Sequence, residues 1–416
     1  MRFDLLIKGG HVVDPARNLD EPSDVAVRAG RIAAVDRNIP PDSALTVVDA
    51  SDQFVTPGLI DLHAHVYWGV TLWGVHADPV ASRTGVTTFV DAGSAGAYTI
   101  PGFREFIVKP ADARIYSLMN ISAVGLVAHV HELEQIDHCD AKLFSRLAHL
   151  YRDVVVGVKV RMERRTVGNN GLEPLRRARL AADECGVPVM VHVAEGPPEL
   201  ADVIGLMKPG DILTHCFTAH SMKIVDGSGR LLDFVRRAWD NGVVMDIGHG
   251  RGSFSYETAD ALAMGGVWPD VISTDLHQFS TSGPMFDLPT CLSKFLNLGM
   301  PFVQVIRSAT QRPAQALGLE GEIGSLAPGR RADIALFRLD TGRFVFHDNF
   351  GNSREGPQRL RNTLTIIDGR PLPKRPAEPL APWAELTPLQ VRLIEEGHAP
   401  ELSIGPDVQQ TLFERR

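Results

Sequence analysis

The feature that most constrains this chain is a series of eight short apolar segments between Thr56 and Leu317, separated by longer stretches at helical spacing. This alternation is typical of βα units and a parallel sheet. Eight such units fit a (β/α)8 TIM barrel, which usually takes about 250 residues. The eight predicted strands are residues 58–65, 86–93, 113–121, 154–160, 187–195, 211–217, 242–250 and 270–277.

Both ends of the chain have a different pattern. Short β-branched segments broken by Gly, Asp and Pro fill residues 1–55 and return in 318–374, which is typical of hairpins. We therefore predict a small β-sandwich domain built from both chain ends, with the barrel at 56–317. Residues 375–416 begin Pro-rich and include a helix-like segment at 387–397. We expect this tail to be an arm of a homo-oligomer or a mobile end.

Composition and charge narrow the functional classes. The net charge is -8, so the chain lacks the basic excess that favours nucleic acid or an anionic membrane. No run reaches the roughly 18 apolar residues of a membrane span, and the first residues lack a signal-peptide layout. The four cysteines are scattered without a C-x-x-C pair, which favours a reducing compartment. We expect a cytoplasmic protein that acts on a small molecule.

Three ligand-capable residues stand at the ends of the first and last predicted strands. In a (β/α)8 barrel the carboxyl ends of the strands form the functional rim. His63 and His65 end the first strand, and residues two apart on a strand share a face. Both imidazoles can therefore hold one cation. Asp275 can reach that cation, because the first and eighth strands are neighbours in a closed barrel.

Three more such residues stand on strands four, five and six. His192 and His215 lie on adjacent predicted strands and can hold a second cation, for which zinc suits the ligand set best. Lys159 lies near the end of strand four. An ammonium beside two dications is repelled, so we expect its pKa to be lowered. A neutral amine can add carbon dioxide, and the resulting carbamate can bridge two metals.

Each of these residues has a commoner explanation when taken alone. A lone H-x-H pair is usually not a metal site, and a lone strand lysine is usually a surface residue. His192 alone would be a core histidine, and Asp275 alone would be a helix N-cap. The ordered set, with each member at a predicted strand end, favours a metal centre.

The ordered set resembles the binuclear branch of the amidohydrolase superfamily. The segments "VTPGLIDLHAH" and "LAPGRRADIALF" add to the resemblance, which covers the chain up to about residue 374. It implies two divalent metals, bridged by an N6-carboxylysine and a hydroxide. The roles that it implies are His63 and His65 on the more buried metal, His192 and His215 on the more exposed one, Lys159 as the bridge, and Asp275 as metal ligand and proton carrier.

Candidate substrate-binding residues follow the strand ends. Tyr67 stands where dihydroorotases carry an arginine for the substrate carboxylate, so the chain departs from that activity. Tyr67 could wall an apolar pocket, although packing aromatics are commoner. Arg161 shares the face of Lys159 and could pair with a substrate carboxylate or form a structural ion pair.

Glycine-rich turns and two further histidines complete the set. Gly93 and Ser94 belong to "GSAG", whose backbone N–H groups could bind an anion or only make a tight connection. His249 is a candidate hydrogen-bond donor to the substrate, and His277 is a weaker one.

The loop sequences are similar to a deacetylase-like or dihydroorotase-like branch of the family. That likeness implies a hydrolase in which a metal-bridging hydroxide attacks an amide or ester acyl bond. The implied substrate is a small carboxylate, either an N-acyl amino acid or an O-acyl 2-hydroxy acid. Two alternatives stay open: a cyclic amide hydrolase of the dihydroorotase or hydantoinase type, and a non-catalytic amidohydrolase-like scaffold. A deaminase is disfavoured, because many deaminases use one metal and lack the strand-four lysine.

Overall fold

The centre of the molecule is a curled parallel sheet. A computed structural model of the chain describes residues 2–128, 130–376, 378–381 and 384–397. Within these residues, seven strands pair side by side in chain order. Most of their residues are buried, as expected for a parallel sheet covered on both faces. The strands are β6 (Leu59–Ala64), β7 (Val86–Asp91), β8 (Arg114–Asn120), β9 (Val155–Met162), β10 (Val189–Val193), β11 (Ile212–Thr214) and β12 (Val244–Asp246).

The prediction of a regular eighth strand at 270–277 is wrong. This segment makes only isolated parallel bridges, from Val271 to Asp246 of β12 and from Leu276 to Ala64 of β6. Between the bridges, Asp275 has a φ of 50°, which breaks the extended backbone. The segment nevertheless lies between β12 and β6 and closes the sheet, so the fold is TIM-barrel-like.

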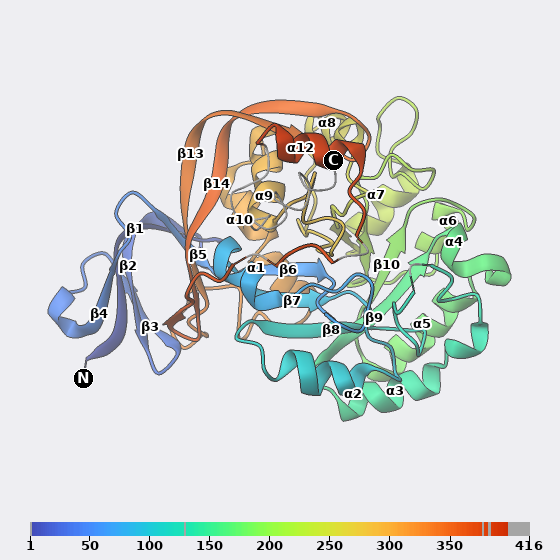
Figure 1. The fold of residues 1–416 in the computed structure, drawn as a ribbon, viewed down its shortest axis with the longest axis horizontal. Coiled ribbons are helices and arrows are strands. Elements are labelled where there is room, and N and C mark those ends of the chain that lie inside the picture. The colour runs from blue at the N-terminus through green and yellow to red at the C-terminus, as the bar shows by residue number, and fades with distance from the viewer. Residues whose placement is uncertain (1, 129, 377, 382–383, 398–416) are drawn as a thin grey trace.

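Helices follow most strands and cover the outside of the parallel sheet (Figure 1). One of the stretches at helical spacing forms α5, which is followed by Gly186 in the left-handed conformation. The α-helices are α1 (Ala77–Thr84), α2 (Ile100–Phe103), α3 (Ala141–Leu150), α4 (Arg164–Val167), α5 (Glu173–Cys185), α6 (Leu200–Ile204), α7 (Asp233–Asp240), α8 (Tyr256–Ala263), α9 (Leu288–Asn297), α10 (Phe302–Ser308), α11 (Gln311–Ala316) and α12 (Pro388–Glu395). Short turns are the 3-10 helices η1 (Pro15–Arg17), η2 (Pro41–Ser43), η4 (Ile136–His138) and η5 (Gly168–Asn170), and the π-helix η3 (Arg104–Val108).

Strands from both chain ends form a second sheet. Its order is β15-β14-β13-β5-β1-β2-β3, with β4 paired to β1. The predicted sandwich is not confirmed, because these strands share one hydrogen-bonded sheet. Its members are β1 (Phe3–Asp14), β2 (Leu19–Arg28), β3 (Arg31–Asp36), β4 (Ala44–Asp49), β5 (Phe54–Pro57), β13 (Ile334–His347), β14 (Ser353–Ile367) and β15 (Arg370–Pro371).

The long β13–β14 hairpin joins the two parts of the molecule. It rises from the second sheet and arches over α9 and α10 (Figure 1). The Leu360 N–H donates to Ser293 Oγ of α9, at 2.9 Å. Phe337 and Leu360 of the hairpin belong to the same apolar core as the barrel strands. The hairpin therefore packs into the barrel core, while much of the second sheet has an apolar cluster of its own.

The described part of the C-terminal tail packs on its own chain. The predicted helix is confirmed as α12, which begins with a capping box made by Thr387 and Gln390. Gln390 Nε2 donates to Phe279 O at 2.6 Å and to Gly283 O at 2.9 Å. These contacts place α12 on the loop that follows Asp275. Residues 398–416 of the predicted arm lie outside the described residues.

None of the helices in the described ranges has the length and apolarity that crossing a bilayer demands.

Candidate metal centre

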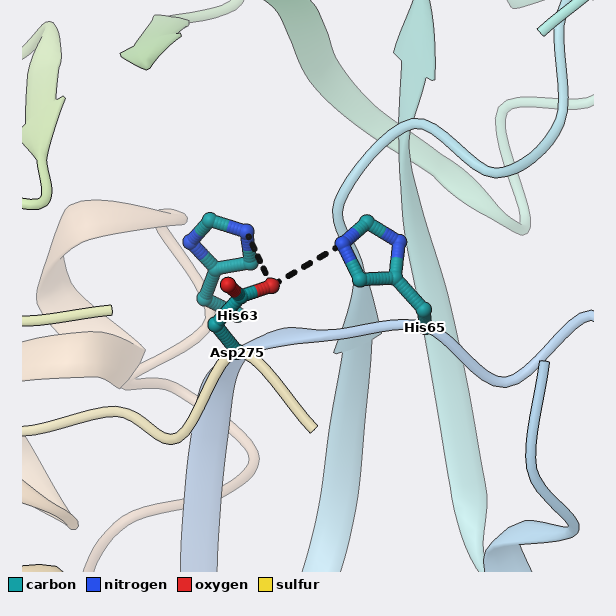
Figure 2. Close-up of side chains that lie close together, drawn as sticks. All are labelled: His63, His65 and Asp275. Atoms are coloured by element: carbon teal, nitrogen blue, oxygen red, sulfur yellow. Dashed lines mark ion pairs between the residues drawn. The ribbon is translucent and has the colours of Figure 1, made fainter. Parts of the chain in front are cut away.

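Three side chains converge on one carboxylate oxygen. His63 Nε2 lies 3.3 Å and His65 Nε2 lies 3.1 Å from Asp275 Oδ1. Figure 2 shows the Asp275 carboxylate between the two imidazoles. One ligand atom from each residue lies within 4.8 Å of the others. This group could therefore hold a metal ion, as the sequence predicts for the first and last strands.

A hydrogen-bond chain fixes the orientation of His63. Thr214 Oγ1 donates to Asp246 Oδ2 at 2.6 Å, so this hydroxyl accepts from His63 Nδ1, 2.8 Å away. Ser273 Oγ donates to the other oxygen of Asp246, at 2.6 Å. With the proton held on Nδ1, the lone pair of His63 lies on Nε2. Such outer partners orient metal-binding imidazoles in proteins.

His65 is oriented by Ser94, one of the predicted substrate-binding residues. Ser94 Oγ lies 2.9 Å from His65 Nδ1. The backbone N–H of Ser94 donates to Asp91 Oδ1, at 2.8 Å. Since both groups are already engaged, the predicted role of Ser94 in binding an anion is not supported. The structure makes it a support of His65.

His192 and His215 present two buried nitrogen atoms to the same region. Their ring centroids lie 4.3 Å apart, and His215 lies 5.0 Å from the ring of His63. His215 Nδ1 donates to Gly248 O at 2.6 Å, which leaves its lone pair on Nε2. Among the described residues, neither His192 Nε2 nor His215 Nε2 has a hydrogen-bond partner. Unpartnered buried nitrogens are costly, and a bound cation would satisfy them.

Lys159 lies beside these imidazoles and is buried. Its Nζ lies 3.0 Å from His63 Nε2 and 3.4 Å from Met190 Sδ. Burial lowers the pKa of Lys159 to about 7, as expected for an amine removed from water. A Cβ on Gly93 would lie 2.8 Å from Lys159 Cβ. Gly93 therefore makes room for the lysine stem, which favours the tight connection that the sequence left open over an anion-binding amide.

Burial keeps the imidazoles neutral. It lowers the pKa of His65 to about 3 and that of His215 to about 4. The pKa values of His63 and His192 are well below the usual value, again mainly because of burial. Neutral imidazole is the form that binds metals, so this environment suits a metal centre.

Two of the six residues adopt a backbone conformation that is rare for side chains other than glycine. The φ angles are 65° at His215 and 50° at Asp275. Such conformations concentrate at functional sites, where surrounding contacts hold them. One such contact is Asp61 Oδ1, which accepts the Thr274 N–H at 3.0 Å. The residue before Asp275 is thereby anchored to β6.

Arg161 is already paired with two carboxylates. Its guanidinium lies 3.0 Å from Glu163 Oε1 and 3.5 Å from Glu132 Oε1. All three side chains are largely buried. This arrangement favours the structural ion pair that the sequence left open over a free clamp for a substrate carboxylate.

Tyr67 contacts Thr99 and Phe103 rather than the six converging residues. Its hydroxyl donates to Thr99 O at 3.1 Å, and its ring packs on Phe103. Tyr67 and Trp68 line a cavity of about 590 Å³. None of the six candidate ligands lines this cavity, so the predicted pocket wall at Tyr67 does not border the candidate metal centre.

His249 has both ring nitrogens occupied. Lys294 Nζ donates to His249 Nε2 at 2.6 Å, and His249 Nδ1 donates to Gly250 O at 3.0 Å. No ring N–H is left for a substrate, so the predicted donor role of His249 is not supported. The partner, Lys294, lies on α9, far along the chain.

His277 does face the candidate centre. Its Nδ1 accepts the Phe279 N–H at 3.2 Å, which places the ring proton on Nε2. That atom lies 4.0 Å from Asp275 Oδ2. The ring packs against Trp73, with centroids 4.9 Å apart. His277 thus places a ring N–H beside the candidate metal centre, where it could donate to a substrate.

Several supporting carboxylates were not predicted from the sequence. Asp61, Asp91 and Asp246 are fully buried and hold the segments that carry the candidate ligands. A signal was present, since Asp61 stands two residues before His63 and shares its face. Asp91 and Asp246 lie within predicted strands and are the last residues of β7 and β12.

Comparison with known proteins agrees with this geometry. The model of the amidohydrolase family matches residues 54–371. A protein of Enterococcus faecalis named as a deacetylase is 33% identical over 373 residues, covering 89% of this chain and 99% of its own.

Two solved structures are also similar. One, described as an adenine deaminase, is 34% identical with a TM-score of 0.84 and covers 89% of this chain and 99% of its own. The other, described as a dihydroorotase, is 32% identical with a TM-score of 0.82, covering 88% and 97%. The family match spans well over half of the chain, and a third of the residues are identical across nearly the whole deacetylase. This chain is therefore an enzyme of the amidohydrolase family, and it is a hydrolase.

Proposed function

We propose that this chain is a metal-dependent deacylase that binds two divalent metal ions, with zinc as the metal that suits the donors best. The observation that carries the proposal is the pair of buried Nε2 atoms on His192 and His215 that have no hydrogen-bond partner among the described residues. They lie beside the group of His63, His65 and Asp275. One metal would be held by that group and the second by His192 and His215.

Lys159 would bridge the two metals as N6-carboxylysine. Its pKa of about 7 makes a neutral amine available near neutral pH. Its Nζ contacts an imidazole nitrogen and a thioether sulfur rather than a carboxylate. This environment supports a carbamate over an ammonium, because no carboxylate in the described ranges accepts a hydrogen bond from the ammonium.

Asp275 has two oxygens with different surroundings. Oδ1 faces His63 and His65, while Oδ2 lies 4.0 Å from His277 Nε2. When bound, the metals would supply water activation and polarisation of the substrate carbonyl. Asp275 would accept the proton of the attacking water on Oδ2 and pass it to the leaving group, as a positioned acid-base does.

The substrate is proposed to be a small acylated carboxylate, either an N-acyl amino acid or an O-acyl 2-hydroxy acid. The name of the Enterococcus relative supports removal of an acetyl group. A second candidate is hydrolysis of a cyclic amide. The similarity to a solved structure described as a dihydroorotase favours it. Against it, Tyr67 stands in the position of the carboxylate-binding arginine of dihydroorotases, and its hydroxyl is bonded to Thr99 O.

A substrate screen separates these candidates. The metal-loaded enzyme would be assayed with N-acetyl and O-acetyl carboxylates in both enantiomers, alongside hydantoins, dihydroorotate and adenine. We expect acyl release from one enantiomeric series and no turnover of the cyclic amides or adenine. Faster turnover of a cyclic amide or of adenine would overturn the deacylase proposal. If the protein hydrolyses none of these compounds, the result would favour the non-catalytic scaffold.

A further inference from the structure

Arg251 is a half-buried cation without a carboxylate partner. It lies in the turn after β12. Among the described residues, no carboxylate forms an ion pair or hydrogen bond with it. Its guanidinium lies over the ring of Phe279, 5.1 Å from the centroid. Burial lowers its pKa, with no anion to offset that cost. Arg161 differs from Arg251, because its charge is balanced by Glu132 and Glu163.

Arg251 stands next to the candidate proton carrier. The preceding residue, Gly250, donates its N–H to Thr274 O at 2.8 Å. A Cβ on Gly250 would collide with Asp275 Oδ2. The backbone that carries Arg251 is therefore in close contact with the Asp275 carboxylate.

A continuous set of rings connects the metal centre to Arg251. Trp73 lies 6.1 Å from the ring of His65 and 5.7 Å from the ring of Phe279. His277 packs against both Trp73 and Phe279, at 4.9 Å and 5.9 Å. This wall begins at a candidate metal ligand and ends at the ring under the guanidinium. A substrate lying along it would have its acyl carbonyl at one end and a polar group at the other.

We propose that Arg251 binds the carboxylate of the substrate and that Trp73, His277 and Phe279 line the space between that carboxylate and the metal centre. A guanidinium stacked on a ring keeps its N–H edge free, and that edge matches a carboxylate with two parallel hydrogen bonds. The assignment rests on the proposed deacylase function and names the residue that selects acidic substrates. It moves this role from Arg161 to Arg251.

The test compares the affinity of the protein for a free carboxylic acid with its affinity for the methyl ester of that acid. Calorimetry would follow N-acetylalanine and its methyl ester binding to the metal-loaded protein, in an enantiomer that the substrate screen shows is not hydrolysed. We expect the acid to bind more tightly than the ester. Arg251→Met should weaken acid binding about 10- to 100-fold, which is the value of one or two hydrogen bonds to a charged group. It should leave ester binding unchanged. Arg251→Lys should give an intermediate loss, since it keeps the charge but not the two-point geometry.

The matched control is Arg152→Met, which removes an exposed arginine after α3 and should change neither ligand. Equal affinity of the parent protein for acid and ester would overturn the assignment. Unchanged acid binding in Arg251→Met would overturn it as well. If the parent protein binds the acid selectively through Arg251 but hydrolyses no acyl substrate, the inference stands and the proposed deacylase function fails.

Discussion

At the scale of single residues, two buried lysines differ in their surroundings. Lys294 donates to His249 Nε2 and to two backbone carbonyls, at 2.6 to 2.8 Å, so its three N–H groups are satisfied as an ammonium. Lys159 has no oxygen acceptor among its hydrogen bonds. Carbon dioxide should therefore add to Lys159 and not to Lys294.

This difference has a predicted pH dependence. Because the folded-state pKa of Lys159 is lowered to about 7, its amine is protonated below that pH and neutral above it. Carbamate formation in metal-free protein should therefore rise as the pH increases through about 7. Carbon-13 NMR with labelled bicarbonate would measure it. The signal should be absent in Lys159→Ala and retained in Lys294→Met. A signal that persists in Lys159→Ala would contradict the assignment.

Arg161 gives a second prediction at this scale. Arg161→Met leaves Glu132 and Glu163 buried without their cation. Removing one partner of a buried ion pair costs about 3–5 kcal/mol, so the free energy of unfolding should fall by about that amount. Denaturant unfolding would measure the change. The double variant Arg161→Met, Glu132→Gln should recover part of it. Unchanged stability with a raised KM would instead make Arg161 a substrate clamp.

The sequence identified the candidate metal ligands. It did not identify which residues contact and orient them. His63 and His65 could be paired from their spacing on one strand, and the other four from their places at strand ends. The roles of Ser94 and His249 could not, because they depend on particular contacts. Ser94 supports His65, and His249 is occupied by Lys294, which lies on a helix with no visible link to it in sequence.

At the scale of elements, α12 supports the loop that carries Phe279. Gln390 is fully buried and donates to Phe279 O and Gly283 O. This loop follows Asp275, and Phe279 is the ring under Arg251. The tail of the chain therefore contributes to the shape of the proposed substrate site, although the family match ends at residue 371.

Gln390→Ala tests this support. One buried and one part-buried carbonyl would lose their donor, and a buried group left unsatisfied costs about 1–3 kcal/mol. Hydrogen exchange at residues 279–283 should become faster, and acid binding by the metal-loaded protein should weaken. Gln135→Ala, at an exposed glutamine, is the matched control and should alter neither. Unchanged exchange at 279–283 in Gln390→Ala would show that α12 does not hold this loop.

The eighth predicted strand shows what a strand pattern cannot reveal. Residues 270–277 begin with a short apolar run that is typical of a buried strand, yet Asp275 turns into the left-handed region. The turn brings its carboxylate to His63 and His65 and requires the hydrogen bonds that Asp61 makes to Thr274. Those contacts come from the tertiary fold, so local sequence could not predict them.

At the scale of the whole molecule, one closed sheet brings residues from β6, β9, β10, β11 and the 270–277 segment to one end. The β13–β14 hairpin packs into the core of this sheet, while much of the second sheet has an apolar cluster of its own. The barrel-like fold could be predicted from the alternation of apolar runs. The single hydrogen-bonded sheet of the chain ends could not, because strand pairing between residues so far apart leaves no local signal.

The central claim is a two-metal centre on this fold, and metal content tests it most directly. Protein prepared with zinc and bicarbonate, then freed of loosely bound ions, would be analysed for metal per chain. About two equivalents are expected, falling in Lys159→Ala together with activity. One equivalent or none in the active parent protein would contradict the account.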